Sequence, residues 1–376
     1  MQDLLRPIDI VRPPAIAFGP GTIAAITGWV QARGLRRPFV IADAFNADRI
    51  GMLGLGPQVV VFSAVRPEPD VANLEAALAC AKAAQPDLVV GFGGGSAMDL
   101  AKLVAVLHDG GQAIADVVGA ERVRGRNCAL IQVPTTSGTG SEAGTRALIT
   151  DPATQNKLAV QSNHMLADFA VVDPDLTLSV PPAVTAATGV DAMAHCVEAY
   201  TNRHAHPLID GYALEGVHLV GRFLPRAIAD SANREARAGL SLASLYGGFC
   251  LGPVNTAAGH AVAYPLGSRH HIAHGAANAL IFPHVLAFNA PAAAERTAAI
   301  LAALGLAAPM EQHAVFAATY GFCERLGIEM RLSRLGVPEG DLATMADEAH
   351  AIRRLLDNNP REISRDEILE IYRAAY

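Results

Sequence analysis

The order of secondary structure along the chain constrains the fold more than any other feature of the sequence. In the first half, short apolar runs alternate with Ala-rich helical stretches. We expect strands at Pro38–Ala42, Val59–Phe62, Asp87–Phe92 and Ala129–Val133, and helices at Val71–Ala84 and Asp99–Leu107. Alternating units of this kind predict a mostly parallel sheet that is covered by helices.

After Pro181-Pro182 the pattern changes, and long Ala/Leu-rich helical stretches replace the strands. They lie at Val184–Tyr200, Ile209–Ala229 and Arg234–Gly248, and helical sequence continues to the end with breaks at glycines. A chain of 376 residues is long enough for two domains. We predict an α/β domain at residues 1–182 and an all-α domain at residues 183–376, with the active site in the cleft between them.

Composition excludes several classes of protein. The formal charge of -7 and the lack of a polybasic block argue against nucleic-acid binding. Mean hydropathy is positive, at +0.26, but no apolar run approaches the roughly 20 residues of a membrane span. The first residues contain no apolar signal segment. Five scattered cysteines fit neither a disulfide framework nor a Cys-type zinc site, so we expect a cytoplasmic protein without nucleic-acid or membrane partners.

A glycine run, Gly93-Gly94-Gly95-Ser96, lies between an expected strand and an expected helix. Glycines let the backbone approach a ligand, and amides at the start of a helix favour an anion such as a pyrophosphate. The run is not the Gly-x-Gly-x-x-Gly fingerprint, so a tight strand-to-helix turn without a ligand explains it as well.

Two other polar features belong to the same half of the chain. Asp43 follows a strand, where an acid can bond a ribose hydroxyl or simply cap a helix. The loop Pro134–Glu142 is rich in Ser, Thr and Gly, and it can wrap a cofactor or lie on the surface. Neither feature alone decides between these readings.

Asp191 and His195 lie four residues apart in an expected helix, which places both side chains on one face. His260 and His274 follow in a Gly/His-rich stretch. One carboxylate and three neutral imidazoles are a plausible ligand set for a divalent transition metal. A lone histidine on an apolar helix is more often a core residue, and Asp191 with His195 can also form a core ion pair. We read His204 and His206, which lie in a polar loop, as facing solvent.

These motifs together resemble the iron-containing (group III) alcohol dehydrogenases. The resemblance covers essentially the whole chain and rests on motifs in the same order: Phe18–Gly21, Gly93–Lys102, Pro134–Glu142, Gly189–Tyr200, Gly259–Ala279 and Asn359–Arg361. It implies a dehydroquinate synthase-like fold, with an N-terminal nucleotide-binding α/β domain and a C-terminal helical metal-binding domain. Homodimers are usual among similar proteins, so we expect a homo-oligomer.

The resemblance also implies the site residues. The metal, Fe(II) or alternatively Zn(II), would be held by Asp191, His195, His260 and His274. The cofactor would lie across a set of residues from the first half: Gly94, Gly95, Ser96, Thr135, Thr136, Thr139 and Lys157. In this family an acid at the position of Asp43 goes with NAD(H) rather than NADP(H), because its carboxylate repels a 2′-phosphate.

The chain departs from the family pattern at three positions. Tyr264 stands where members often have a histidine that relays a proton, and a phenol titrates only near pH 10. Glu68 replaces an amide residue near the cofactor. Ala147 replaces an aromatic residue after Arg146, and Arg146 can attract a carboxylated substrate or pair with Glu142.

We therefore predict an NAD(H)-linked, metal-dependent dehydrogenase that interconverts a small primary alcohol and its aldehyde by direct hydride transfer. Tyr264 is a candidate proton relay and Arg146 a candidate substrate contact. Two alternatives stay open. One is reduction of an oxo-acid, as in the maleylacetate-reductase-like branch, which lacks the full metal set. The other is a non-redox relative of the same fold.

Overall fold

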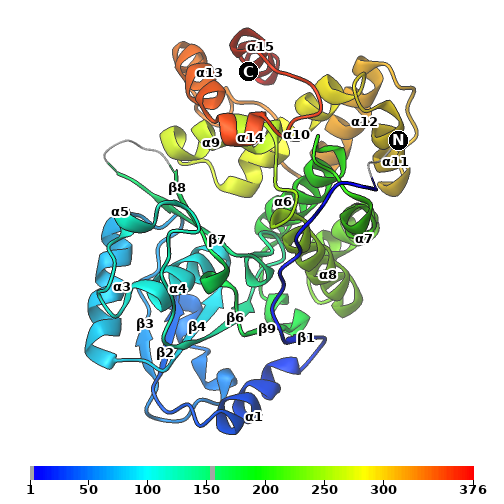
Figure 1. Cartoon of the computed structure of the whole chain (residues 1–376). Coiled ribbons are helices and arrows are strands. Elements are labelled where there is room, and N and C mark those ends of the chain that lie inside the picture. Colours follow the sequence, from blue (N-terminus) through cyan, green and yellow to red (C-terminus); the bar gives the residue numbers. More distant parts are fainter. Residues whose placement is uncertain (1–3, 153–156) are drawn as a thin grey trace. The chain divides into compact units, whose positions relative to one another are not determined.

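The computed structural model describes residues 4–152 and 157–376, and the chain forms two compact units (Figure 1). The first, which we call the α/β unit, contains residues 11–136 and 140–178. The second, the helical unit, contains residues 4–10, 137–139 and 179–376. The short segment 137–139 therefore belongs to the helical unit although it lies within the first half of the sequence.

A six-stranded parallel sheet forms the centre of the α/β unit, as the alternating pattern predicts. Its strands are arranged in the order β1-β9-β6-β4-β2-β3. They are β1 (Ile16–Phe18), β2 (Pro38–Ala42), β3 (Val60–Phe62), β4 (Leu88–Gly93), β6 (Ala129–Pro134) and β9 (Phe169–Val172).

Helices cover both faces of this sheet, which is why its central strands are apolar throughout. On β2, Phe39 and Ile41 pack in the core formed with α3 (Val71–Ala84) and α4 (Gly95–Leu107), whereas Val40 and Ala42 pack in the core formed with α1 (Ala25–Ala32). Such two-sided burial produces continuous apolar runs instead of alternation. The helices of this unit are α1 (Ala25–Ala32), α2 (Ala44–Ala47), α3 (Val71–Ala84), α4 (Gly95–Leu107) and α5 (Ile114–Val117).

A second, three-stranded sheet was not expected from the sequence. It contains β5 (Gly119–Ala120), β7 (Arg146–Thr150) and β8 (Lys157–Gln161), and β7 pairs with β8 in antiparallel register. β7 alternates buried and half-buried residues, the pattern of a strand with one covered face. The alternation in β7 covers only five residues, which is too short to identify the strand without β8, the strand that it pairs with.

The helical unit contains only helices and connecting turns among its described residues, in agreement with the predicted all-α half. Its α6 (Pro182–Thr201) packs against α7 (Pro207–Ala229), α8 (Arg234–Leu251) and α10 (His274–Asn289). The remaining helices are α9 (Ala258–His270), α11 (Ala294–Ala303), α12 (Gln312–Arg325), α13 (Leu342–Ala351), α14 (Arg353–Leu356) and α15 (Arg365–Ala375).

Within residues 4–152 and 157–376, no helix is both long and apolar enough to cross a membrane.

The prediction that His206 faces solvent was wrong. Its side chain is buried, and its Nδ1 atom accepts a hydrogen bond from the backbone N–H of Leu208 at 3.1 Å. His206 therefore caps the start of α7.

Candidate active site

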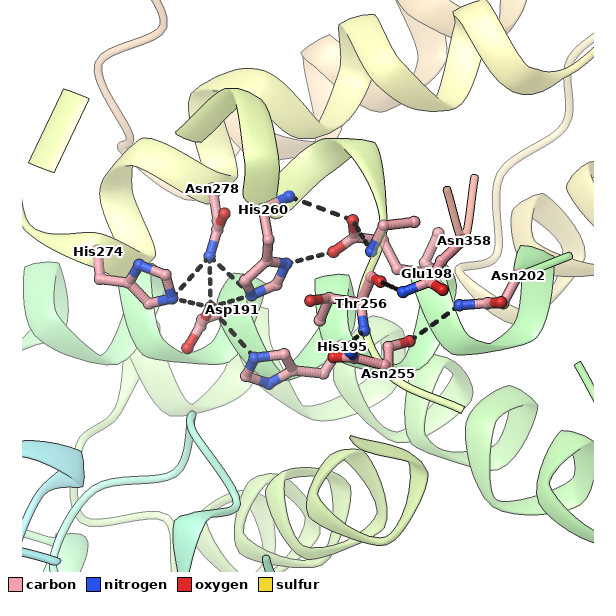
Figure 2. Close-up of polar contacts among 12 residues, drawn as sticks. Asp191, His195, Glu198, Asn202, Asn255, Thr256, His260, His274, Asn278 and Asn358 are labelled. Atoms are coloured by element: carbon pink, nitrogen blue, oxygen red, sulfur yellow. Dashed lines mark hydrogen bonds and ion pairs between the residues drawn. The ribbon is translucent and has the colours of Figure 1, made fainter. Parts of the chain in front are cut away.

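The helical unit brings Asp191, His195, His260 and His274 together (Figure 2). Their candidate ligand atoms all lie within 4.8 Å of one another. The Oδ1 atom of Asp191 is 3.9 Å from Nε2 of His195 and 3.6 Å from Nε2 of both His260 and His274. Three helices supply these side chains, because the first two come from α6, His260 from α9 and His274 from the start of α10.

Glycines next to these residues allow the helices to approach one another. A Cβ atom on Gly275 would lie 2.5 Å from the carbonyl oxygen of Ala187, so only glycine lets the start of α10 lie against α6. At the start of α9, a Cβ on Gly259 would lie 3.0 Å from Oε1 of Glu198. Gly275 is therefore a packing requirement of the cluster, and Gly259 leaves room for the Glu198 carboxylate.

Burial and mutual charge set the protonation of this cluster. Burial by itself raises the pKa of Asp191, but His195, His274 and His260 outweigh it and hold that pKa well below its usual range. Burial also lowers the pKa of His195 to about 4, so its imidazole is neutral at pH 7. For His260, burial lowers the pKa, but Glu198 and Asp191 outweigh it and raise that pKa to about 10. Because a metal binds neutral imidazole and ionised carboxylate, the His260 ring would have to release a proton when a metal binds.

Glu198 is a member of this site that the sequence analysis did not identify. Its Oε2 atom bonds Nδ1 of His260, and its Oε1 atom accepts hydrogen bonds from the backbone N–H groups of Ala257 (2.9 Å) and His260 (3.2 Å). Although burial disfavours the carboxylate, His260 and these N–H donors lower the pKa of Glu198. A carboxylate behind a ligating histidine orients the ring and increases its basicity.

A spacing signal for Glu198 was present in the sequence. It lies seven residues after Asp191 and three after His195, and therefore on the same side of α6. The sequence did not show that the loop before α9 reaches this carboxylate.

The cluster fits a divalent metal ion. Metal bonds to histidine nitrogen and carboxylate oxygen are about 2.0–2.2 Å long, so the separations of 3.6–3.9 Å are those of ligands that share one ion. Four buried or partly buried polar groups that face one another are costly unless an ion satisfies them.

Tyr264 lies on α9, one turn after His260. Its ring centroid is 6.3 Å from that of His260 and 5.8 Å from that of His274, and the guanidinium of Arg354 lies 5.7 Å from its ring centroid. The structure thus places the tyrosine beside two of the four clustered residues. Its role in proton transfer stays a prediction.

In the α/β unit, the predicted glycine run connects β4 to α4. Gly94 caps the helix, and Gly95 and Ser96 form its first turn, so the helix begins four residues earlier than predicted. A Cβ on Gly93 would lie 2.8 Å from that of Ala97, and one on Gly94 would lie 3.2 Å from Oγ1 of Thr136. Close packing against Ala97 and Thr136 therefore explains these glycines even without a ligand. The run also presents the N-terminal amides of a long helix, which favour anions.

Asp43 caps a helix, which is the second of the two readings from the sequence. Its carboxylate accepts hydrogen bonds from the backbone N–H of Asn46 at 2.9 Å and from the Asn46 side chain at 2.7 Å. The same Asn46 amide donates to Oγ1 of Thr135 at 3.3 Å. Asp43 is also close to the glycine run, because a Cβ on Gly93 would lie 3.3 Å from its Oδ2 atom.

Lys157 begins β8 and forms an ion pair with Glu68, one of the departures from the family pattern. It also donates to Oγ1 of Thr150 at 2.8 Å. The backbone N–H of Glu68 donates to Oγ of Ser96 at 3.3 Å, which links this pair to the first turn of α4. The structure brings Lys157, Glu68 and Ser96 together, whereas Thr139 belongs to the helical unit.

Arg146 is the first residue of β7, and two residues of α4, the buried Lys102 and the half-buried Asp99, hold this strand. Lys102 donates to the carbonyl oxygen of Arg146 at 2.8 Å and to Oγ of Ser141 at 2.8 Å. Asp99 accepts from Ser141 at 2.5 Å and from the backbone N–H of Leu148 at 2.9 Å. The Arg146 guanidinium itself donates to Gln161 on β8 at 3.1 Å.

Glu142 follows Ser141, which bonds both Lys102 and Asp99. This glutamate makes the stability of the protein depend on pH. It is fully buried, and burial raises its pKa to about 7 from the usual 4.5. Between these two pH values the unfolded chain has released the proton and the folded chain has not, so stability decreases as pH rises from about 4.5 to 7.

We expect the Glu142→Gln variant to lack this loss. Relative to the wild type, the free energy of unfolding of this variant should increase by on the order of 3 kcal/mol between pH 4 and pH 8, as measured by urea denaturation. The exposed Glu75→Gln variant serves as the control and should follow the wild type. A constant difference between Glu142→Gln and the wild type at all pH values would contradict the burial of an ionisable carboxyl.

Comparison with known proteins agrees with this geometry. The family model of iron-containing alcohol dehydrogenase matches residues 13–174, and the C-terminal model of the Fe-containing alcohol dehydrogenase family matches residues 185–376. The chain is 37% identical to long-chain-alcohol dehydrogenase 1 of Geobacillus thermodenitrificans, over 98% of this chain and 96% of that protein. It is 30% identical to the NAD-dependent methanol dehydrogenase of Bacillus methanolicus, over 96% and 98%.

Solved structures show the same relationship. The crystal structure of a 1,3-propanediol oxidoreductase superimposes with a TM-score of 0.92 and 31% identity, covering 99% of this chain and 100% of that one. The predicted fold class and the resemblance are both confirmed. The family models together span nearly the whole sequence, and the chain belongs to the iron-containing alcohol dehydrogenase family.

Proposed function

We propose that this protein is a metal-dependent, NAD(H)-linked oxidoreductase that interconverts a small primary alcohol and its aldehyde by direct hydride transfer. The observation that carries the proposal is the buried cluster of one carboxylate and three imidazoles in a chain of this family. The complete ligand set also favours this function over the alternative, reduction of an oxo-acid, because enzymes of that branch lack the full set of metal ligands.

Asp191, His195, His260 and His274 would hold the metal ion, which supplies a Lewis acid that stabilises the alkoxide form of the substrate. Nitrogen and carboxylate ligands suit Fe(II), and Zn(II) also fits them. Glu198 keeps the His260 ring oriented through Nδ1, so that Nε2 faces Asp191 and the other two histidines. Within the proposal, residues 183–376 form the metal-binding and substrate domain.

Residues 1–182 would form the NAD(H)-binding domain, with the cofactor accepting or supplying the hydride. The first turn of α4, with Gly94, Gly95 and Ser96, offers amides for the pyrophosphate. Thr135, Thr136, Thr139 and Lys157 would supply hydroxyl and ammonium groups to the cofactor. The name of the methanol dehydrogenase from Bacillus methanolicus supports NAD as the cofactor.

Two residues would act on the substrate side. Tyr264, beside His260 and His274, would pass the substrate proton to solvent. Arg146, held on β7 by Lys102, would contact a polar group of the substrate. Since Arg146 already donates to Gln161, a carboxylated aldehyde would compete with that hydrogen bond.

Asp43 would select NAD(H) over NADP(H) by repelling the 2′-phosphate. The Asp43→Asn variant keeps an oxygen that can cap α2 but removes the negative charge. We expect its KM for NADP(H) to fall about tenfold, which corresponds to ~1.4 kcal/mol, while the KM for NAD(H) changes little. Steady-state kinetics with both cofactors measures this, and an unchanged preference would show that the Asp43 charge does not face the cofactor.

The function is tested by following NADH absorbance in the near ultraviolet. The metal-loaded protein should form NADH from NAD and primary alcohols, and should consume NADH with the corresponding aldehydes, carboxylated ones included. Failure to turn over any member of a broad panel, with metal and cofactor both bound, would favour a non-redox relative of the fold. Reduction of an oxo-acid that does not depend on metal would favour the maleylacetate-reductase-like reading.

A further inference from the structure

Glu68 lies beside the proposed cofactor site of the α/β unit, at a position where the sequence departs from the family pattern. It belongs to the segment Pro67-Glu68-Pro69, which precedes α3. Its carboxylate forms an ion pair with the ammonium group of Lys157, at the start of β8. The side chain of Lys157 is 13% exposed and that of Glu68 is 42% exposed. The lysine is therefore largely enclosed, and a more exposed carboxylate neutralises its charge.

The backbone of Glu68 is strained. Its φ angle is +52°, in the left-handed region that residues other than glycine rarely adopt. A residue keeps such a conformation only where neighbouring contacts hold it, and strained residues cluster at binding and catalytic sites. The contacts around Glu68 therefore indicate what this strain positions.

Two segments hold Glu68 in this conformation. Its backbone N–H donates to Oγ of Ser96 at 3.3 Å, in the first turn of α4. Its carbonyl oxygen accepts from Oγ1 of Thr150 at 3.5 Å, and the backbone N–H of Thr150 donates to the carbonyl oxygen of Pro69 at 2.9 Å. The Thr150 hydroxyl also accepts from Lys157 at 2.8 Å. Glu68 thus connects the helix turn proposed for the pyrophosphate with the lysine proposed for the cofactor.

An anionic cofactor and the Glu68 carboxylate require the same ammonium group. Lysine has three N–H donors, and Glu68 and Thr150 already accept hydrogen bonds from Lys157. A negatively charged ligand gains less from an ammonium group whose charge a carboxylate already neutralises. Because the backbone contacts fix the position of Glu68, its carboxylate stays within reach of Lys157 when the ligand arrives.

We propose that Glu68 limits the affinity for NAD(H) by competing with the cofactor for Lys157. The inference rests on the proposed function, since it requires a cofactor at the first turn of α4 and at Lys157. The ion pair satisfies the enclosed ammonium group before the cofactor binds, and the cofactor must then displace the carboxylate. Weaker binding lets the cofactor leave more readily after hydride transfer, and product release limits the rate of many enzymes.

Cofactor affinity tests the proposal without an assay of turnover. The dissociation constant for NADH is measured on the metal-loaded protein by the fluorescence of NADH. Glu68→Gln keeps the size and polarity of the side chain but removes its charge. We expect this variant to bind NADH about 3- to 10-fold more tightly than the wild type at low ionic strength. The difference should shrink in about 0.5 M NaCl, because salt screens partly exposed charges.

Glu68→Asp separates competition for the lysine from repulsion between the carboxylate and the cofactor. Aspartate keeps the charge, but its side chain is shorter by one carbon–carbon bond of about 1.5 Å, so its carboxylate reaches Lys157 less well. Aspartate also tolerates left-handed backbone better than most residues. Under the proposal, Glu68→Asp should also bind NADH more tightly than the wild type. Lys157→Met should bind NADH more weakly.

Glu121→Gln is the matched control. Glu121 is a second exposed glutamate of the α/β unit with a left-handed backbone, at a φ angle of +53°. It lies at the other end of β8, where its backbone N–H donates to the carbonyl oxygen of Gln161 at 2.7 Å. The substitution removes the same charge from the same unit and should leave the affinity for NADH unchanged.

Four results would contradict the inference, and they are distinguishable. Unchanged or weaker NADH binding in Glu68→Gln would show that the carboxylate does not compete with the cofactor. Tighter binding in Glu68→Gln with wild-type affinity in Glu68→Asp would show that repulsion acts without competition for the lysine. Wild-type affinity in Lys157→Met would show that the lysine does not contact the cofactor. A metal-loaded wild-type protein that binds no NADH would remove the proposed function itself.

Discussion

The Asp191→Asn variant should lose metal binding and at least about a thousandfold of its alcohol-oxidation rate. Asp191 is the only anionic member of the cluster, and its Oδ1 atom faces all three histidines. An amide has nearly the same shape but cannot neutralise a cation. Because a bound metal contributes several kcal/mol to stabilising the reacting charge, its loss costs several powers of ten in rate.

His274→Ala is a second test of the same cluster with less risk to folding. The side chain of His274 is 27% exposed, whereas those of Asp191 and His260 are each 3% exposed. The variant should fold and should also lose metal, as measured by elemental analysis and NADH formation. His313→Ala, which alters an exposed histidine on α12, should keep both metal and activity. Full metal content in Asp191→Asn and in His274→Ala would contradict the assignment of the ligands.

The Glu198→Ala variant should bind metal about 10- to 100-fold more weakly than the wild type, as expected when the partner of a ligating histidine is lost. It leaves Nδ1 of His260 and the N–H groups of Ala257 and His260 without their acceptor. Each buried group without a partner costs roughly 1–3 kcal/mol, so the unfolding temperature should fall as well.

Glu198→Gln separates these two effects. Glutamine keeps an oxygen that can accept from the two backbone N–H groups, but it removes the charge that holds His260. We expect it to recover most of the stability and little of the metal affinity, measured by thermal unfolding and chelator competition. Wild-type affinity in Glu198→Gln would mean that the carboxylate only anchors the loop before α9.

The sequence predicted the parts of this molecule in which one residue type serves one purpose. The apolar runs of β2 and β4 are buried on both faces, and they predicted the parallel sheet because no other common arrangement buries such runs. The ligand cluster was predicted because Asp191 and His195 share a helix face, because His260 and His274 follow in a Gly/His-rich stretch, and because the order of these motifs resembles that of a known family.

Contacts between distant segments could not be predicted in the same way. Glu198 has its role through Ala257 and His260, about 60 residues later, and the spacing on α6 alone does not show this. Asn278 on α10 looks like an ordinary residue of an apolar helix until α6 and α9 bring Asp191 and His260 against its side-chain amide. The antiparallel pairing of β7 with β8 depends on a register that neither short strand specifies alone.

Asp43 and Lys157 show a further limit. The residue types were compatible with cofactor binding, but the structure also gives each a local partner, Asn46 for the first and Glu68 for the second. An acid at a strand end caps the next helix whether or not a ribose is bound. Substitution of Asp43 and Lys157 therefore tests their roles toward the cofactor, whereas the fold alone does not.

The most direct test of the central claim is the rate of NADH formation from a primary alcohol before and after removal of metal. The purified protein is analysed for bound metal, treated with a chelator, and then resupplied with Fe(II) or, separately, Zn(II). We predict that chelation abolishes the rate and that Fe(II) restores it with about one ion bound per chain. Full activity in a preparation shown to be free of metal would contradict the account.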